Sequence, residues 1–408
     1  MGSPWTTRCC SALALTVAFS LAIAARAEQL RPFPSPRPAH SRADRTPLSL
    51  FPVRSLWTLD LNNDLLASAP PAFDKTHAFF PIEGDRIVAY DLVTGQQLWI
   101  APIAATGRPV ASPDLLFVIE SAALDAVRVT DGSTAWQLPF AEPLAAPLAW
   151  DNGWLVAATL DGSVLAFRAS DGRLVWRRDI GSPAHAAPAL AADRVYVSTE
   201  DGRVVALRVD TGERVWERRL GGAPSDILAL DERLYVGSKD NFFYCLKTED
   251  GEEAWRWRTG ADVIGLPVVD EHSVYFVSLD NVLRALSRGS GNQRWRRVLP
   301  LRPTTGPIQA AGTLIVTGLA EALPAFIAGN GTPAGNLAPG GEVVAPPHVL
   351  DVPGIYGPVV VVITRDVAKG ATVTAHARSI EPSLLTAITL PNLVTFTPAA
   401  TPPTIPRP

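Results

Sequence analysis

Cysteine is scarce in this sequence, and neither sign of charge dominates it. Three cysteines occur among 408 residues, which is too few for a disulfide scaffold or a cysteine-rich zinc domain. The formal net charge is only −4, whereas binding to nucleic acid or to an acidic membrane face needs clustered basic surface. We therefore expect no nucleic-acid partner, and membrane association that is indirect at most.

Apolar residues, by contrast, are plentiful. Hydrophobic residues make up 47% of the chain, so a sizeable core is available and wholesale disorder is excluded. At roughly 150 residues per domain, the length suggests about two or three domains, or one large fold built from repeats.

The two ends of the chain differ in composition from the middle. Arg8 is followed by a run of small and apolar residues from 11 to 25, and Ala25-Arg26-Ala27 fits a cleavage site, a pattern typical of an export signal. The run is shorter than the roughly 20 residues that span a membrane, although an uncleaved anchor is the alternative. We predict a periplasmic or secreted protein with four regions, namely a signal peptide at 1–27, a proline-rich linker at 28–52, the folded domain at 53–380 and a Pro/Thr-rich tail at 381–408.

A unit of the form Gly-x-x-x-Trp recurs through the middle of the chain, with its tryptophans 37 to 40 residues apart. Its six complete copies are Gly95/Trp99, Gly132/Trp136, Gly172/Trp176, Gly212/Trp216, Gly251/Trp255 and Gly291/Trp295. A seventh copy keeps Gly331 but has Gly335 at the tryptophan position. Ten residues before each of these positions stands a small residue: Ala89, Ala126, Ala166, Ala206, Cys245, Ala285 or Ala325. A fixed period of this length indicates a repeat architecture.

Each repeat contains four segments with strand character. In the copy from 182 to 220, short apolar or alternating runs are separated by Asp201-Gly202 and Thr211-Gly212, which are hairpin signals because glycine adopts the positive φ of tight turns. Four antiparallel strands per repeat, placed around a ring, form a β-propeller. We predict an all-β fold, an eight-bladed β-propeller of four-stranded antiparallel sheets, with seven blades as the alternative.

The blade count depends on the ends of the repeat region. Residues 342–349, 358–365 and 372–378 supply three strands without a following Gly-x-x-x-Trp strand, and Leu56-Trp57-Thr58 resembles an outer strand without a preceding blade. Joining them completes an eighth blade and leaves no open edge. We expect the small residues to let neighbouring sheets approach, and the indoles to dock in the wedge between outer strands. The predicted docking residues are Trp57, Trp99, Trp136, Trp176, Trp216, Trp255 and Trp295.

The fullest copy, Ala-Tyr-Asp-Leu-Val-Thr-Gly-Gln-Gln-Leu-Trp at 89–99, resembles the tryptophan-docking motif of the pyrroloquinoline-quinone (PQQ) repeat superfamily, as does the copy at 206–216. Eight blades and an export signal look most like the BamB-like branch, whose members are non-enzymatic scaffolds in envelope protein assembly. The resemblance implies a protein partner, no enzymatic activity and no cofactor. BamB-type proteins are usually lipoproteins, whereas here the early cysteines precede the apolar run, so lipid anchoring is not expected.

The same superfamily includes quinone-dependent dehydrogenases, which are similar in fold. They carry an adjacent Cys-Cys pair over the cofactor, a calcium site and an aspartate base in the channel. Here the adjacent pair, Cys9-Cys10, lies in the signal, and Cys245 falls on the register of the small residue. A quinone-dependent oxidoreductase and a ligand-sensing propeller remain the alternatives to a scaffold, and we predict no catalytic, cofactor-binding or metal-binding residues.

A binding site is expected at the mouth of the central channel, where the inner strands converge. A proline marks the inner strand of several repeats, as Pro188 does 28 residues before Trp216. Polar residues beside that register are Arg108, His185, Asp226 and Asp262. We predict that they bind a ligand or a partner peptide through charge-assisted hydrogen bonds, the alternative being solvated residues at loop ends. The protein is expected to be a monomer.

Overall fold

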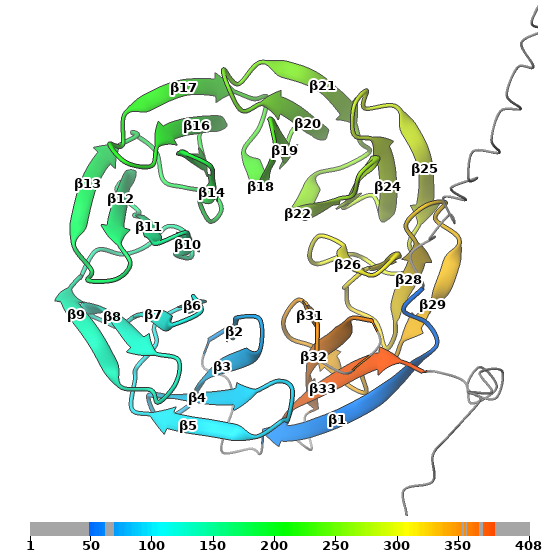
Figure 1. Ribbon diagram of the computed structural model, residues 1–408. Helices are drawn as coiled ribbons and strands as arrows, with labels where there is room; N and C mark the ends of the chain where they lie inside the picture. Colours follow the sequence, from blue (N-terminus) through cyan, green and yellow to red (C-terminus); the bar gives the residue numbers. More distant parts are fainter. Residues whose placement is uncertain (1–48, 62–68, 353–354, 356, 367–369, 380–408) are drawn as a thin grey trace, which may run out of the picture. The chain divides into compact units, whose positions relative to one another are not determined.

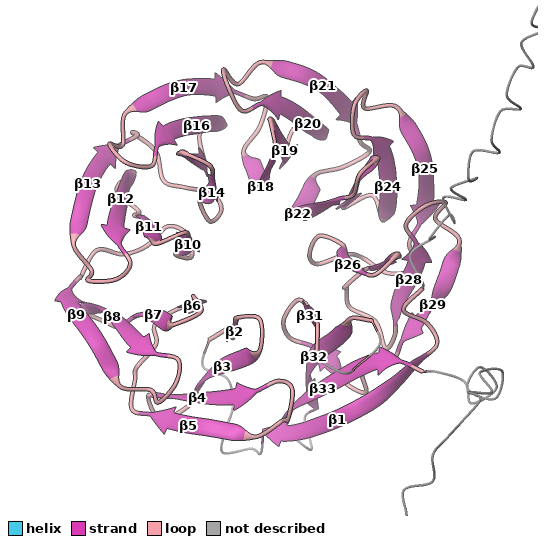
Figure 2. Cartoon of the chain, viewed as in Figure 1, coloured by secondary structure: helices cyan, strands magenta, loops and turns pink. Residues whose placement is uncertain are grey.

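The structure is a computed structural model that describes residues 49–61, 69–352, 355, 357–366 and 370–379. Every regular element in this part is a β-strand (Figures 1 and 2). The strands form eight antiparallel sheets, which are the blades of a propeller. The all-β class and the eight blades are therefore confirmed, and the seven-bladed alternative is wrong. The predicted signal peptide, nearly all of the linker and the tail lie outside the described residues and stay predictions.

Seven blades are consecutive meanders whose first strand is innermost and whose fourth is outermost (Figure 1). Blade 1 contains β2 (Ala72–Phe73), β3 (His77–Ile82), β4 (Arg86–Asp91) and β5 (Gln97–Ala101), and blade 2 contains β6 (Val110–Ala111), β7 (Leu115–Ile119), β8 (Ala123–Arg128) and β9 (Thr134–Pro139). Blade 3 contains β10 (Ala149–Asp151), β11 (Trp154–Ala158), β12 (Ser163–Arg168) and β13 (Leu174–Asp179).

The next four blades follow the same order. Blade 4 contains β14 (Ala189–Ala191), β15 (Arg194–Ser198), β16 (Arg203–Arg208) and β17 (Arg214–Arg219), and blade 5 contains β18 (Pro224–Leu230), β19 (Arg233–Ser238), β20 (Phe242–Lys247) and β21 (Glu253–Arg258). Blade 6 contains β22 (Val263–Val269), β23 (Ser273–Ser278), β24 (Val282–Ser287) and β25 (Gln293–Val298), and blade 7 contains β26 (Ile308–Ala310), β27 (Thr313–Ile315), β28 (Leu323–Ile327) and β29 (Pro333–Leu337).

Blade 8 is assembled from both ends of the described chain. Its strands are β1 (Val53–Leu61), β33 (Gly370–Arg378), β32 (Val359–Asp366), β30 (Glu342–Val343) and β31 (His348–Leu350). The outer strand β1 pairs antiparallel with β33, with Thr58 opposite Thr374, while the inner position is divided between β30 and β31, which both pair with β32. The ring is thus closed by hydrogen bonds between residues from its two ends, as the sequence predicted.

The repeated tryptophans join each blade to the next. In six blades the indole Nε1–H donates to a backbone carbonyl of the following blade: Trp99 to Val129 (2.7 Å), Trp136 to Ala169 (3.0 Å), Trp176 to Val209 (2.7 Å), Trp216 to Thr248 (2.9 Å), Trp255 to Arg288 (3.2 Å) and Trp295 to Ala328 (2.9 Å). The ring also covers the motif glycine of that blade. At Gly212, whose φ is +68°, an added Cβ would lie 2.6 Å from the Trp176 ring, so glycine is needed for both conformation and space. Trp57 also lies beside the motif glycine Gly95, but an added Cβ there would be 3.7 Å from the ring, an ordinary van der Waals contact.

The small residue ten positions before each tryptophan acts within its own sheet. Ala206 lies directly opposite Trp216 on one side and Tyr196 on the other, and the two aromatic rings meet above it with their centroids 5.9 Å apart. Cys245 occupies the same place between Tyr235 and Trp255 and is fully buried. The small side chain makes room for two large ones in a cross-strand row. Ala206 also belongs to the hydrophobic cluster shared by blades 4 and 5, so the expected close approach of neighbouring sheets is compatible with the structure.

The seventh repeat lacks a tryptophan, and Phe51 fills the space. An added Cβ at Gly335 would lie 2.5 Å from Cδ1 of the Phe51 ring. The adjacent Leu50 is 1% exposed, and its backbone N–H donates to Oγ1 of Thr313 in blade 7 (3.1 Å). Leu50 and Phe51 were assigned to the linker from the sequence, but they pack into the fold ahead of the boundary expected at residue 53.

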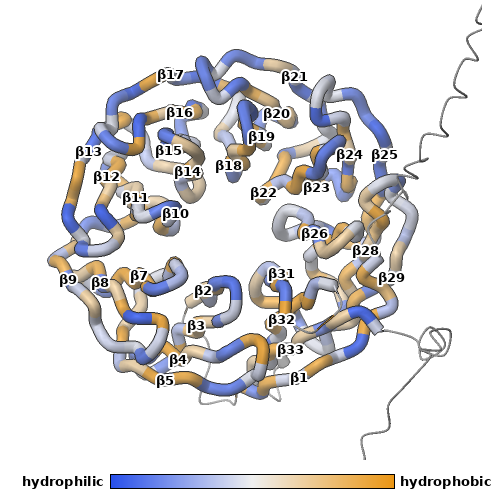
Figure 3. The backbone as a smooth tube through the Cα atoms, viewed as in Figure 1, coloured by the Kyte–Doolittle hydropathy of each residue, from blue (hydrophilic) through white to orange (hydrophobic). Residues whose placement is uncertain are grey.

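The hydrophobic core lies between the blades rather than at the centre of the ring. One cluster joins Phe79 and Trp99 of blade 1 to Leu116 and Val127 of blade 2, and comparable clusters connect other neighbours. The outer strands β17 and β25 are largely hydrophilic outside their tryptophans (Figure 3). Because the core is peripheral, the inner strands leave an open channel in which polar side chains can gather.

Candidate functional site

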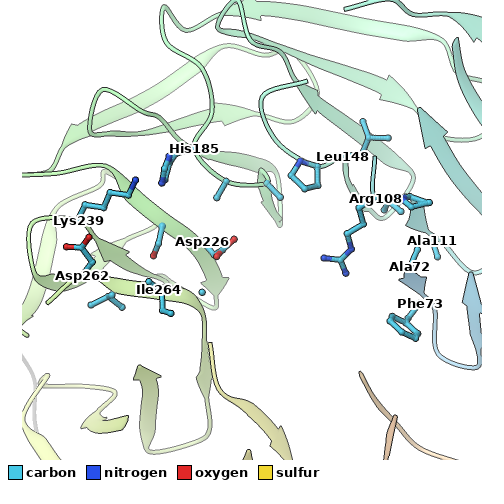
Figure 4. Close-up of a pocket in the computed structure, with 18 of the residues that line it drawn as sticks. Ala72, Phe73, Arg108, Ala111, Leu148, His185, Asp226, Lys239, Asp262 and Ile264 are labelled. Carbon is cyan, nitrogen blue, oxygen red and sulfur yellow. The ribbon is translucent and has the colours of Figure 1, made fainter. Parts of the chain in front are cut away.

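All four residues predicted at the channel mouth line one cavity of about 650 Å³ (Figure 4). Arg108 precedes β6, His185 precedes β14, Asp226 lies in β18, and Asp262 comes directly before β22. Each residue therefore lies at or near the start of the inner strand of its blade. Because the inner strands of different blades approach one another there, the four side chains can line one cavity. The four side chains come from blades 2, 4, 5 and 6.

Arg108 and Asp226 face each other across this cavity (Figure 4). No hydrogen bond or ion pair joins either side chain to another residue in the part of the chain that the structure describes. His185 is different, since its Nδ1 lies 3.5 Å from Oε1 of Glu200. Arg108 and Asp226 thus place opposite charges, not bonded to each other, on opposite walls of the cavity.

Partial burial in the cavity shifts the pKa values of both Asp226 and Arg108. Loss of hydration raises the pKa of Asp226, although its backbone hydrogen bond and the nearby charges of His185 and Arg108 partly oppose the rise. Loss of hydration also lowers the pKa of Arg108, with the charge of Asp226 acting in the opposite direction. Both shifts mean that the charged form is stabilised less here than in open water.

Three further residues at the mouth were not singled out from the sequence. Lys239 follows β19 and lines the same cavity. Phe73 in β2 stacks on His348 in β31, with ring centroids 4.4 Å apart and an interplanar angle of 10°. Pro71 stands 28 residues before Trp99, in the same register as Pro188, and so marks the inner strand that contains Phe73. His348 reaches the mouth only because the ring closes between blades 1 and 8.

His348 is held in place from a second side. Its Nε2 lies 3.0 Å from the backbone carbonyl oxygen of Asp74. Burial lowers its pKa, against the effect of Asp74. Beside it, a smaller hollow of about 120 Å³ is lined by Phe73, Arg108, His348, Ala345 and four prolines, namely Pro70, Pro71, Pro346 and Pro347.

The described residues do not fit the calcium site and the adjacent cysteine pair of the superfamily's dehydrogenases. Calcium takes about six to eight oxygen ligands, but no group of three potential metal ligands exists among the described residues, so Asp226 and Asp262 do not form such a set. Cys245, the one cysteine within the described ranges, is buried beneath Trp255 in the sheet. Burial raises the pKa of its thiol to about 11, as suits a core residue.

The comparisons with known proteins agree with this architecture. A family model described as outer membrane protein assembly factor BamB matches residues 120–228 and 219–345, which together exceed half of the chain. The chain belongs to this family. The BamB family shares the PQQ-like repeat, so the resemblance stated from the tryptophan motif is confirmed. A comparison with curated protein sequences finds no match.

Several solved structures align with most of this chain. Sqt1 from Saccharomyces cerevisiae aligns with a TM-score of 0.66 at 10% identity, covering 80% of this chain and 99% of that one. A quinohemoprotein alcohol dehydrogenase from Comamonas testosteroni aligns with a TM-score of 0.60 at 12% identity, covering 80% and 76%. BamB from Moraxella catarrhalis aligns with a TM-score of 0.45 at 18% identity, covering 80% and 97%. At these identities, the alignments with TM-scores of 0.60 and 0.66 show a shared fold and nothing about function.

Within the described residues of this BamB-family chain, no helix is long and apolar enough to cross a membrane.

Proposed function

We propose that this chain is an exported, monomeric propeller that acts as a non-catalytic protein-binding scaffold in the cell envelope, in the manner of the BamB family. The observation that carries the proposal is the convergence of side chains from separate blades on one cavity at the channel mouth. Phe73, Arg108, His185, Asp226 and Asp262 come from five blades. Such a surface exists only in the closed ring and presents groups of both signs to a partner.

The size of the surface favours a macromolecular partner. A second hollow of about 480 Å³ lies between blades 2 and 3 and shares Arg108 and Pro147 with the main cavity. The proline-lined hollow beside His348 also shares Arg108. Arg108 therefore stands where three hollows meet, and a partner segment that extends across them would place it at the centre of the contact, where arginine contributes most to binding.

The positions of the potentially reactive groups support a scaffold rather than an oxidoreductase. The Cys245 thiol belongs to a cross-strand row that Ala206 and Ala285 occupy in neighbouring blades. The aspartates of the Asp-Gly and Asp-Asn turns have structural partners of their own, as Asp201 has in Arg203 and Asp280 in Arg284. The Cys245 thiol and these turn aspartates thus take part in packing and ion pairs that stabilise the fold.

Co-purification with a charge-reversed mouth tests the proposal. Wild-type protein, the double variant Arg108→Glu/Asp226→Arg and the control Arg173→Glu, on the exposed turn before β13, are used as baits in envelope extracts of the source organism. We expect the wild type and the control to retain the same envelope proteins, and the mouth variant to lose them. Equal recovery by all three baits, or unchanged outer-membrane protein levels after deletion of the gene, would contradict the proposal.

Export is tested separately. Mass spectrometry of the mature protein from the periplasmic or culture fraction is expected to find an N-terminus at Glu28, directly after the predicted cleavage site. Recovery of the full-length chain from the membrane fraction would instead identify an uncleaved anchor.

A further inference from the structure

Arg108 and Asp226 carry opposite charges, yet no ion pair joins them. Elsewhere an aspartate in a turn bonds directly to an arginine in the strand that follows: Arg284 Nη2 lies 2.5 Å from Asp280 Oδ2, and Arg203 Nε lies 2.7 Å from Asp201 Oδ2. Arg108 and Asp226 instead point toward each other from blades 2 and 5 across an open cavity (Figure 4). The gap between them is therefore part of the architecture, because each belongs to a different blade.

A ligand with charges at both ends would satisfy the two groups together. Charged groups that have lost hydration without gaining a partner are destabilised, as the perturbed Arg108 and Asp226 are. A carboxylate on the guanidinium and an ammonium group on the aspartate would each form a charge-assisted hydrogen bond, the stronger class of such bonds.

The walls between the two groups are mostly apolar. Ala72, Val110, Ala111, Leu148 and Ile264 line them. The volume of about 650 Å³ lies within the range of roughly 300–1,000 Å³ that small-ligand sites span. Apolar walls between two opposite charges suit a molecule with small apolar side chains and charged ends.

The other charged groups set the orientation of such a ligand. His185, Lys239 and Asp262 all lie on the wall formed by blades 4 to 6, together with Asp226. Arg108 is the charged lining residue of the opposite wall. A carboxylate therefore has its strongest partner at Arg108, and an ammonium group finds its partners on the opposite wall.

We propose that the channel mouth binds a short peptide with free termini, with its carboxylate on Arg108, its ammonium group on Asp226 and its apolar side chains against the inner-strand walls. The proposal deepens the proposed function in that it uses the same mouth. It concerns binding by the isolated protein, however, and does not require the envelope partner.

Calorimetric titration of the purified protein with three probes tests the assignment. The probes are tri-alanine, N-acetyl-tri-alanine and tri-alanine amide, which differ only in their terminal charges. We expect tri-alanine to bind, and each blocked peptide to bind about ten- to a hundredfold more weakly, because a hydrogen bond between charged groups is lost.

Two variants assign the ends of the peptide. Arg108→Gln should weaken the binding of tri-alanine at least about tenfold. It should also make tri-alanine and its amide bind with equal affinity, since the partner of the carboxylate is gone. Asp226→Asn should make tri-alanine and its N-acetyl form bind alike. Arg173→Gln, on the outer rim, should bind all three peptides as the wild type does. Thermal unfolding of each variant confirms that the ring is intact.

Absence of tri-alanine binding to the wild type would overturn this proposal, as would equal binding of the three peptides or equal weakening of all three by each variant. These results are independent of partner capture. If the protein retains its envelope partner but does not bind tri-alanine, only the peptide site is refuted. If it binds tri-alanine but no envelope partner, only the scaffold function is refuted.

Discussion

Replacement of Phe51 by alanine tests whether this ring closes the propeller where the seventh tryptophan is missing. The ring lies against Gly335 and joins the cluster that contains Leu50, Leu337 and Val360, from blades 7 and 8 and the segment before β1. Truncation of the side chain should leave a void between these two blades. We therefore expect Phe51→Ala to destabilise the ring at its point of closure.

The size of the effect follows from the burial of the ring. Replacing a fully buried phenylalanine by alanine costs about 3–5 kcal/mol. Because Phe51 is only partly buried, we expect the free energy of unfolding to fall by about 2 kcal/mol. For a domain of this size, such a loss lowers the midpoint of thermal unfolding by roughly 4 °C.

Calorimetry and hydrogen exchange read out the size and the place of the change. Exchange should increase in β1 and β29, which flank the void, and not in the blades opposite. Phe242→Ala is a matched control, since Phe242 is also partly buried but lies in blade 5, which keeps Trp255. An unchanged melting temperature, or a uniform rise of exchange around the ring, would show that Phe51 does not replace the missing indole.

Four further substitutions test the docking, the core thiol and a buried histidine. Trp216→Phe removes the donor to Thr248 and should lower the free energy of unfolding in urea by about 1–2 kcal/mol, whereas Trp57→Phe should lower it less, because the Trp57 indole has no hydrogen-bond partner among the described residues. Cys245→Ala restores the residue of the other repeats and should change this free energy by less than about 1.5 kcal/mol, and the wild-type thiol, with its pKa raised to about 11 by burial, should resist Ellman's reagent until the protein unfolds. Burial lowers the pKa of His376, so protons bind the unfolded chain first and stability should decline as the pH falls through about 6.5. Urea unfolding between about pH 7.5 and 5.5 should show a smaller decline for His376→Gln.

Opposite results would contradict specific parts of the structure. If Trp216→Phe and Trp57→Phe lower the free energy of unfolding equally, the indole hydrogen bond of Trp216 does not contribute to stability. Rapid labelling of Cys245 in the folded protein would be incompatible with its burial beneath Trp255. The same pH dependence with and without His376 would mean that its imidazole titrates alike in both states.

The repeat architecture was accessible from the sequence because its determinants are local. A glycine such as Gly212 is required for a positive φ and for contact with the preceding indole, and Trp216 stands four residues later, on the outer strand that follows this turn. Each repeat carries these requirements in itself, so the blades, their order and the closing role of β1 followed from spacing. The candidates Arg108, His185, Asp226 and Asp262 also followed, since the inner-strand register is part of the repeat.

Contacts that join distant repeats were decided only by the tertiary structure. Nothing in the local sequence marks Phe51 as the substitute for a tryptophan at position 335, because the two meet only when the first and last blades close the ring. The opposition of Arg108 and Asp226, and the stacking of Phe73 on His348, likewise depend on the number of blades around the channel. A periodic signal describes how one blade packs on the next, whereas distances across the channel are set by the closed ring as a whole.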